Sequence, residues 1–163
     1  MSQGDNKKIV IQLQNSVFLP EVVKFLEEGH TITLRLKGYS MRPFLENERD
    51  KALLNKAGAL KVGDPVLAEI SHGHFVLHRI VSISGDDVTL LGDGNLSPEH
   101  CKSADIKGSV IGFYRKGRGR LDRTDGRKWF IYSWFWMRLL PVRRYLLAIH
   151  RRMIRIPVLG RFI

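Results

Sequence analysis

Apolar and polar residues alternate most regularly from residue 32 to residue 37, where every second position is apolar. A period of two is typical of a strand with one buried face. Stretches of similar character predict further strands at residues 51–54, 65–70, 74–83, 87–91 and 109–114. Gly85 and Asp86 lie between two of these stretches and predict a hairpin turn. Short strands joined by turns with Gly and Asp favour a mainly β fold, a compact coiled sheet or partial barrel.

Two regions outside these strands show the longer apolar period of an α-helix. Residues 16–28 predict an N-terminal helix that Ser16 can cap and a glycine ends. Residues 129–140 are aromatic and apolar, and Pro141 breaks or kinks the pattern. Residues 142–156 then predict a basic amphipathic helix with arginines on one side. Its apolar side would consist of Val142, Tyr145, Leu146, Ile149, Met153 and Ile156.

Positive charge is concentrated in the last third of the chain. The formal net charge is +11, of which residues 1–113 contribute −1 and residues 114–163 contribute +12. The first part of this basic region has almost no apolar side chains, and such a segment cannot bury enough surface to order itself. We therefore expect a β body over residues 1–114, a flexible basic linker over 115–128 and an aromatic, basic tail over 129–163.

Candidate chemistry is concentrated in three short segments of the β body. Ser40 lies in a Gly-Tyr-Ser-Met-Arg-Pro turn, His78 follows in a predicted strand, and Asp93 lies between two glycines. A serine hydroxyl needs a base within hydrogen-bond reach, and an imidazole titrates near neutrality. A carboxylate on the other ring nitrogen would fix the tautomer and stabilise the imidazolium. Each residue alone would be ordinary turn or strand chemistry, but the ordered set predicts an active site.

Other reactive side chains do not enlarge this site. His72 and His74 lie in a Ser-His-Gly-His turn without a nearby cysteine or carboxylate pair, so a metal site there is a weak hypothesis. We predict neither a metal nor an organic cofactor. Cys101 is the single cysteine, which excludes an intramolecular disulfide framework and favours a structural role.

Several segments resemble the catalytic domain shared by type I signal peptidases and the self-cleaving repressors of the SOS response. Residues 38–43 resemble the Ser-Met-x-Pro box of that family's nucleophile, and residues 63–67 (Gly-Asp-Pro-Val-Leu) resemble its Gly-Asp-x-Val strand. Residues 76–81 resemble the box of the base. Most bacterial members have lysine there, whereas this chain has His78-Arg79, as archaeal and endoplasmic-reticulum signal peptidases do. The resemblance implies the family's β fold, with residues 1–114 as a Ser-His endopeptidase domain.

The resemblance leaves the third catalytic residue open between two carboxylates. Residues 92–95 (Gly-Asp-Gly-Asn) resemble the family's Gly-Asp-Asn-Asn box, which contains Asp93. In the histidine-type enzymes the orienting aspartate lies several residues beyond that box, and Glu99 occupies this place here. We predict Ser40 as nucleophile, His78 as base, and Asp93 or Glu99 as the orienting residue, with Asp93 slightly favoured.

The surroundings of the serine also differ from those in signal peptidases. They usually have a serine two positions before the nucleophile, which helps to bind the oxyanion, whereas this chain has Gly38, as the repressor branch does. We therefore expect backbone N–H groups, including that of Ser40, to form the oxyanion hole. An extended substrate would pair with an exposed strand edge near the serine turn.

The tail is better suited to a membrane interface than to a membrane span. A span needs about 20 mainly apolar residues, and a central arginine costs roughly 2.5 to 3.5 kcal/mol. Residues 129–149 contain three arginines and Pro141. Tryptophan and tyrosine favour the headgroup level, and arginine attracts anionic lipid. We expect residues 129–163 to bind an anionic membrane surface, and the alternative is a helical pair packed on the β body or on a partner.

The chain start predicts no signal peptide, because residues 1–15 lack a long apolar region. We therefore expect a membrane-associated peptidase, peripheral on the cytoplasmic face, that cleaves a peptide or preprotein. A catalytically silent scaffold that binds a membrane or a partner is one alternative. A nucleic-acid binder that uses the basic tail is less favoured, because the aromatic residues form one apolar block and no helix-turn-helix is evident.

Overall fold

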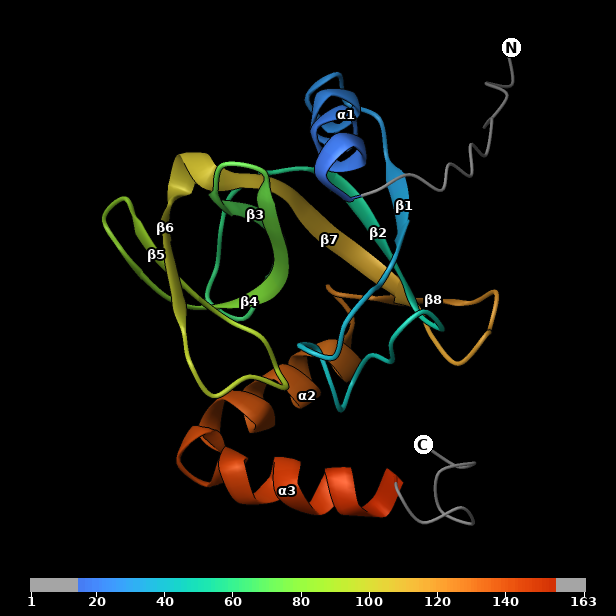
Figure 1. Cartoon of the computed structure of the whole chain (residues 1–163), viewed down its shortest axis with the longest axis vertical. Helices are drawn as coiled ribbons and strands as arrows, with labels where there is room; N and C mark the ends of the chain where they lie inside the picture. The colour runs from blue at the N-terminus through green and yellow to red at the C-terminus, as the bar shows by residue number, and fades with distance from the viewer. Residues whose placement is uncertain (1–14, 155–163) are drawn as a thin grey trace.

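The computed structural model describes the backbone of residues 15–154 and the side chains of residues 18–154. The strands are β1 (Ile32–Arg35), β2 (Lys51–Lys56), β3 (Pro65–Ser71), β4 (His74–Ser84), β5 (Asp87–Leu91), β6 (Glu99–Lys102), β7 (Ile106–Tyr114) and β8 (Leu121–Arg123). Over the described residues these strands form one antiparallel sheet in the order β1-β2-β7-β3-β4-β5-β6, with β8 paired to β7 (Figure 1). The fold is mainly β, and β1 and β6 end the sheet without pairing with each other.

The helices lie at the two ends of the molecule. They are α1 (Asn15–Glu27), α2 (Arg127–Arg138) and α3 (Arg143–Ile154), with short 3-10 turns η1 (Ser103–Asp105) and η2 (Leu140–Val142). Figure 1 shows α1 at one end of the long axis and α3 at the other. The structure confirms both predicted helical regions and the break at Pro141. The side chain of Ser16, Ile156 and the predictions for residues 1–14 lie outside the described part.

The predicted strands and the hairpin are confirmed. The turn Gly85-Asp86 joins β4 to β5, where Ser84 pairs with Asp87. β6 and β8 were not predicted, because Glu-His-Cys-Lys and Leu-Asp-Arg are too short and too polar to show a period of two. The first residue of β6 is Glu99, one of the two candidate orienting carboxylates.

The C-terminal helices pack on the β body. Trp129 of α2 belongs to the same buried cluster as Leu26 of α1 and Phe113 of β7. The ring centres of Phe44 and Trp129 lie 5.1 Å apart, and Tyr132 stacks on Phe44 at 4.4 Å. Burying side chains of this size is worth about 1.5 to 3 kcal/mol each. Along residues 15–154 no helix is long and apolar enough to cross a bilayer.

Residues 115–128 differ from the expected flexible linker. β8 pairs with β7 from Gly112 to Tyr114. Arg115 donates a hydrogen bond of 2.9 Å to the carbonyl of Phe44. These contacts order the segment although it has little apolar surface, because backbone and charged groups find partners on the body. The division of the chain into three domains stays a prediction.

Candidate active site

Ser40 lies in the loop of residues 36–50 that connects β1 to β2. Gly38 has a φ of +93°, a conformation that favours glycine, and its N–H donates a hydrogen bond of 2.7 Å to Oδ1 of Asn47. Asp50, buried at the end of the loop, accepts hydrogen bonds from two backbone N–H groups. These bonds fix the loop from both ends, and they leave Ser40 half-buried on its turn.

Ser40 and His78 line the same pocket, which has a volume of about 130 Å³. The loop supplies the serine and β4 supplies the histidine, so two distant parts of the sequence meet here. The apolar part of the wall is formed by Leu36, Met41, Leu45, Phe75 and Leu77. A pocket of this size and lining suits one small apolar group.

Gly92 lets the serine loop approach the histidine ring. A Cβ on Gly92 would lie 2.5 Å from the carbonyl oxygen of Ser40 and 3.0 Å from Cδ2 of His78. The Ser40 carbonyl and Cδ2 of the His78 ring therefore both lie against Gly92. The N–H of Gly94 donates a hydrogen bond of 2.7 Å to the same carbonyl. The Gly-Asp-Gly-Asn segment therefore sets the spacing between Ser40 and His78.

The other ring nitrogen of His78 contacts Glu99. Nδ1 lies 2.6 Å from Oε2 of Glu99. β5 lies between β4 and β6, but it ends at Leu91, before the position opposite His78. A carboxylate at this position holds the proton on Nδ1 and leaves Nε2 free to accept one.

The electrostatic environment favours a neutral His78. Burial lowers the pKa of His78 below its ordinary value, while the charge of Glu99 and its hydrogen bond act in the opposite direction. A neutral imidazole is the form that a general base requires. The position of Glu99 also limits the cost of the imidazolium that forms when the base takes a proton.

Asp93, which we favoured as the orienting residue, has a different partner. Its carboxylate accepts two hydrogen bonds from the guanidinium of Arg79, at 2.8 and 2.7 Å, and both side chains are fully buried. Among the described residues it makes no hydrogen bond to His78. Our preference for Asp93 therefore does not hold, because a buried guanidinium without an anionic partner would be strongly unfavourable. Glu99 takes the place beside His78.

Helix α2 packs against the buried pair of Arg79 and Asp93 and contacts both residues. The Tyr132 hydroxyl donates a hydrogen bond of 2.8 Å to Asp93, and the indole N–H of Trp136 donates one of 3.2 Å to the Asp93 carbonyl. Arg79 also donates to the Ser133 hydroxyl at 2.5 Å. Sequence reasoning missed these contacts. The sequence held one signal of them: Ser133 is the single small polar residue of an aromatic helix, and its spacing from Trp136 places both on one helix face.

The serine itself is not yet engaged by the base. Among the described residues no hydrogen bond joins the Ser40 hydroxyl to His78, although both line one pocket. Such bonds are often long or poorly aligned in the absence of substrate. The backbone N–H of Ser40 likewise has no partner within the described part of the chain.

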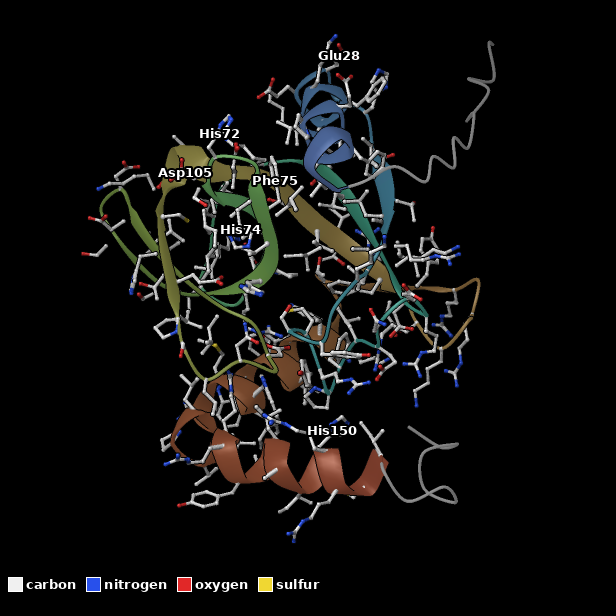
Figure 2. The ribbon with its side chains drawn as sticks, viewed as in Figure 1. Glu28, His72, His74, Phe75, Asp105 and His150 are labelled. Atoms are coloured by element: carbon white, nitrogen blue, oxygen red, sulfur yellow. The ribbon has the colours of Figure 1, made fainter. Side chains whose placement is uncertain are left out.

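His72, His74 and Cys101 are not among the residues that line this pocket. His72 and His74 are exposed at the β3–β4 turn, far from α3 (Figure 2). Residues 15–154 contain no group of three or more His, Cys, Asp or Glu arranged to hold a metal ion. Cys101 is buried on β6, and burial raises the pKa of its thiol, which disfavours the reactive thiolate.

Comparisons with known proteins identify no relative. The chain matched no model of a known protein family and no curated protein. The short segments that resemble signal peptidases therefore remain a prediction, and the site has to be judged on its own geometry.

Proposed function

We propose that this protein is a serine endopeptidase of the signal-peptidase-like type, with Ser40 as nucleophile, His78 as base and Glu99 as orienting carboxylate. The observation that supports it most strongly is the 2.6 Å contact between Nδ1 of His78 and Glu99, made by a ring that lines the same pocket as Ser40. A serine, an imidazole and a carboxylate in this sequence of contacts form the arrangement that activates a hydroxyl.

In the proposed reaction, the Ser40 oxygen attacks the scissile carbonyl carbon while Nε2 of His78 takes the hydroxyl proton. The carbonyl oxygen becomes an oxyanion, which the Ser40 N–H is placed to stabilise. Collapse of this intermediate breaks the C–N bond, and the leaving amine takes the proton from His78. Water then attacks the acyl-enzyme with His78 again as base, which releases the new carboxylate and regenerates Ser40.

The surroundings of the pocket support a peptide as substrate. β1 is the end strand of the sheet and leads directly into the serine loop, so its free edge offers backbone hydrogen bonds to an extended chain. The small pocket beside Ser40, lined by both apolar and polar residues, would hold one short side chain next to the scissile bond. We therefore propose cleavage after a small residue in an extended, unfolded segment.

The fold agrees with this proposal. The segments that resemble the signal-peptidase boxes lie on the serine loop, on β3, on β4 and at the end of β5. Residues 38–43 and 76–81 both supply walls of one pocket, and Gly92 and Gly94 lie against the Ser40 carbonyl, although these segments are spread over more than fifty residues of sequence. This convergence is what a shared catalytic role requires, and it makes a set of unrelated turns a less economical explanation.

A serine-directed fluorophosphonate tests the proposal without knowledge of the substrate. The intact protein should be labelled at Ser40, as mapped by mass spectrometry of its peptides. The His78→Gln variant should be labelled far more slowly, because its Ser40 hydroxyl lacks a base. If a folded protein is labelled nowhere, or equally in the His78→Gln variant, the catalytically silent scaffold is favoured instead.

A further inference from the structure

Helix α2 has two different sides. The inner side carries Trp129, Ser133 and Trp136, which are buried against the β body. The outer side carries apolar residues at the intervening positions, and all of them are exposed, with Phe130 69% exposed. These outer residues are Phe130, Ile131, Trp134 and Phe135. Large side chains that face solvent on consecutive turns mark a contact surface rather than scattered exposure.

Helix α3 repeats this arrangement. Arg143 and Leu147 are buried on its inner side, and His150 lies on the side that faces the body (Figure 2). The outer side exposes Tyr145, Ile149 and Met153. The tryptophans predicted as headgroup anchors divide accordingly: Trp129 and Trp136 belong to the protein core, and only Trp134 is exposed.

Charge indicates what can cover these two outer sides. Residues 127–154 contain seven Lys or Arg and no Asp or Glu. Arg138, Arg144 and Arg152 are exposed among the apolar residues, and the Arg138 guanidinium lies 4.2 Å from the ring centre of Trp134. A second copy of this surface would oppose arginine to arginine, whereas an anionic lipid surface complements both the charges and the apolar groups.

The inner sides connect this surface to the catalytic loops. Arg143 reaches the Gly92 carbonyl at 3.4 Å, and Trp136 donates to the Asp93 carbonyl. Arg151 and Glu99 line one open pocket of about 390 Å³. A surface bound to α2 and α3 would therefore lie at a fixed distance from the residues that orient His78.

We propose that the outer sides of α2 and α3 form one docking surface for an anionic membrane, while their inner sides remain packed on the catalytic loops. Apolar side chains enter the interface and arginines pair with lipid phosphates. The enzyme is thereby held in one orientation beside the membrane. Lipid binding itself does not depend on Ser40 or His78, so this proposal stands or falls separately from the proposed activity.

Vesicle sedimentation of the full chain tests the docking surface. The protein should pellet with vesicles of phosphatidylcholine mixed with phosphatidylglycerol, and much less with phosphatidylcholine alone. Changing Arg138, Arg144 and Arg152 to Gln should weaken binding on the order of a hundredfold, about fivefold per arginine. The matched control changes three exposed basic residues elsewhere, Lys24, Arg35 and Arg118, to Gln, and it should bind nearly as the native chain does. Ser40→Ala should bind unchanged.

The contribution of apolar side chains to vesicle binding is tested by two matched phenylalanine variants. Phe130→Ser on the outer side of α2 should weaken binding about tenfold, since burying such a ring is worth about 1.5 to 3 kcal/mol. Phe25→Ser should leave binding unchanged, because Phe25 is also exposed but lies on α1 at the opposite end of the molecule.

Tryptophan fluorescence tests whether the inner sides stay packed. Anionic vesicles should shift the emission to shorter wavelength through Trp134 alone, so Trp134→Phe should keep most of the binding and lose the shift. A shift that persists in Trp134→Phe would mean that the buried Trp129 or Trp136 changes environment, which contradicts docking by an intact helix pair. Absence of sedimentation, equal binding by the arginine variant, or a dimer in buffer that Phe130→Ser dissociates would overturn the proposal.

Discussion

Two neighbouring residues of β4, His78 and Arg79, point to opposite faces of the strand and meet two different carboxylates. On one face His78 contacts Glu99, whose side chain is 29% exposed and lies beside an open pocket. On the other face Arg79 and Asp93 are both 0% exposed and are surrounded by α2. The second pair is held by mutual attraction: burial opposes the charge of Arg79, but Asp93 outweighs it and raises the pKa of Arg79.

The difference between the two faces concerns function and stability. The His78 side chain is only 4% exposed, but it lines the pocket beside Ser40, and Glu99 is 29% exposed, so a small group in the pocket can reach the ring. A fully buried pair mainly specifies structure, because removing either partner leaves a charge without compensation. We therefore propose that the His78 face supports catalysis, while the Arg79 face attaches the C-terminal helices.

The largest expected effect comes from removing the helices. A chain that ends at Tyr114 loses the buried rings of Trp129 and Trp136 and exposes the Arg79–Asp93 pair. We expect it to lose at least about 5 kcal/mol of stability, which is comparable to the total for an ordinary domain. Urea unfolding measured by circular dichroism checks this. If the truncated chain unfolds at the same midpoint as the full chain, the helices are an independent appendage.

Asp93→Asn should act on stability. The change leaves the buried guanidinium of Arg79 with a neutral partner, and it should cost about 3 to 5 kcal/mol in the free energy of unfolding. Adding Arg79→Met should restore part of that loss, since it removes the guanidinium that Asp93 binds, although Arg143 stays buried nearby. Denaturant midpoints of the two single variants and the double variant supply the comparison. A double variant that is less stable than Asp93→Asn would contradict this account.

Glu99→Gln should act on catalysis. Gln keeps the size of the side chain but cannot stabilise the imidazolium, so kcat should fall by about 100- to 10,000-fold. The free energy of unfolding should change less than in Asp93→Asn, because the Glu99 side chain is 29% exposed whereas Asp93 is fully buried. A fall in kcat for Asp93→Asn alone, measured per folded molecule, would reverse the assignment of the two carboxylates.

The pH dependence should show the smallest effect. Since burial lowers the pKa of His78 below its ordinary value of 6.5, the base stays neutral below that pH, and the acidic limb of kcat/KM should lie below pH 6.5. Glu99 raises this pKa, so Glu99→Gln should shift the limb further toward acid. An acidic limb that moves toward neutral pH in this variant would exclude direct contact between the two groups.

The same lowered pKa affects stability in a defined direction. The unfolded chain binds a proton at His78 more readily than the folded chain does, so the stability contributed by the neutral ring is complete above pH 6.5. It is lost as the pH falls from 6.5 through the folded-state pKa. Thermal unfolding across this range should be less pH-dependent in His78→Gln, which also provides a control for other titrating groups.

Much of the sheet could be predicted from the sequence, because its strands alternate or are flanked by turn residues. The chain order of Ser40 and His78 also indicated a shared site. The choice between Asp93 and Glu99 could not be made from spacing. It depended on β6, which is too polar and short to be recognised, and on where β5 ends beside Gly92.

The C-terminal region shows a different limit. Its aromatic and basic composition predicted helices and a surface role, but not which side of each helix faces the body. The buried side is determined by partners distant in sequence. In α2, the Tyr132 hydroxyl donates a hydrogen bond to Asp93, and Phe44 stacks on the Tyr132 ring. A local pattern contains no information about such partners, so packing of the tail on the β body was only the alternative to membrane binding.

The central claim is tested most directly by the rate of peptide cleavage in Ser40→Ala, His78→Gln and the double variant. Each folded protein is incubated with the same degenerate peptide mixture, and the products are quantified by mass spectrometry. If Ser40 and His78 act as one unit, each single change abolishes cleavage at the native sites and the double change adds almost nothing. Cleavage that persists in either folded single variant would contradict the assignment of this site as a serine peptidase.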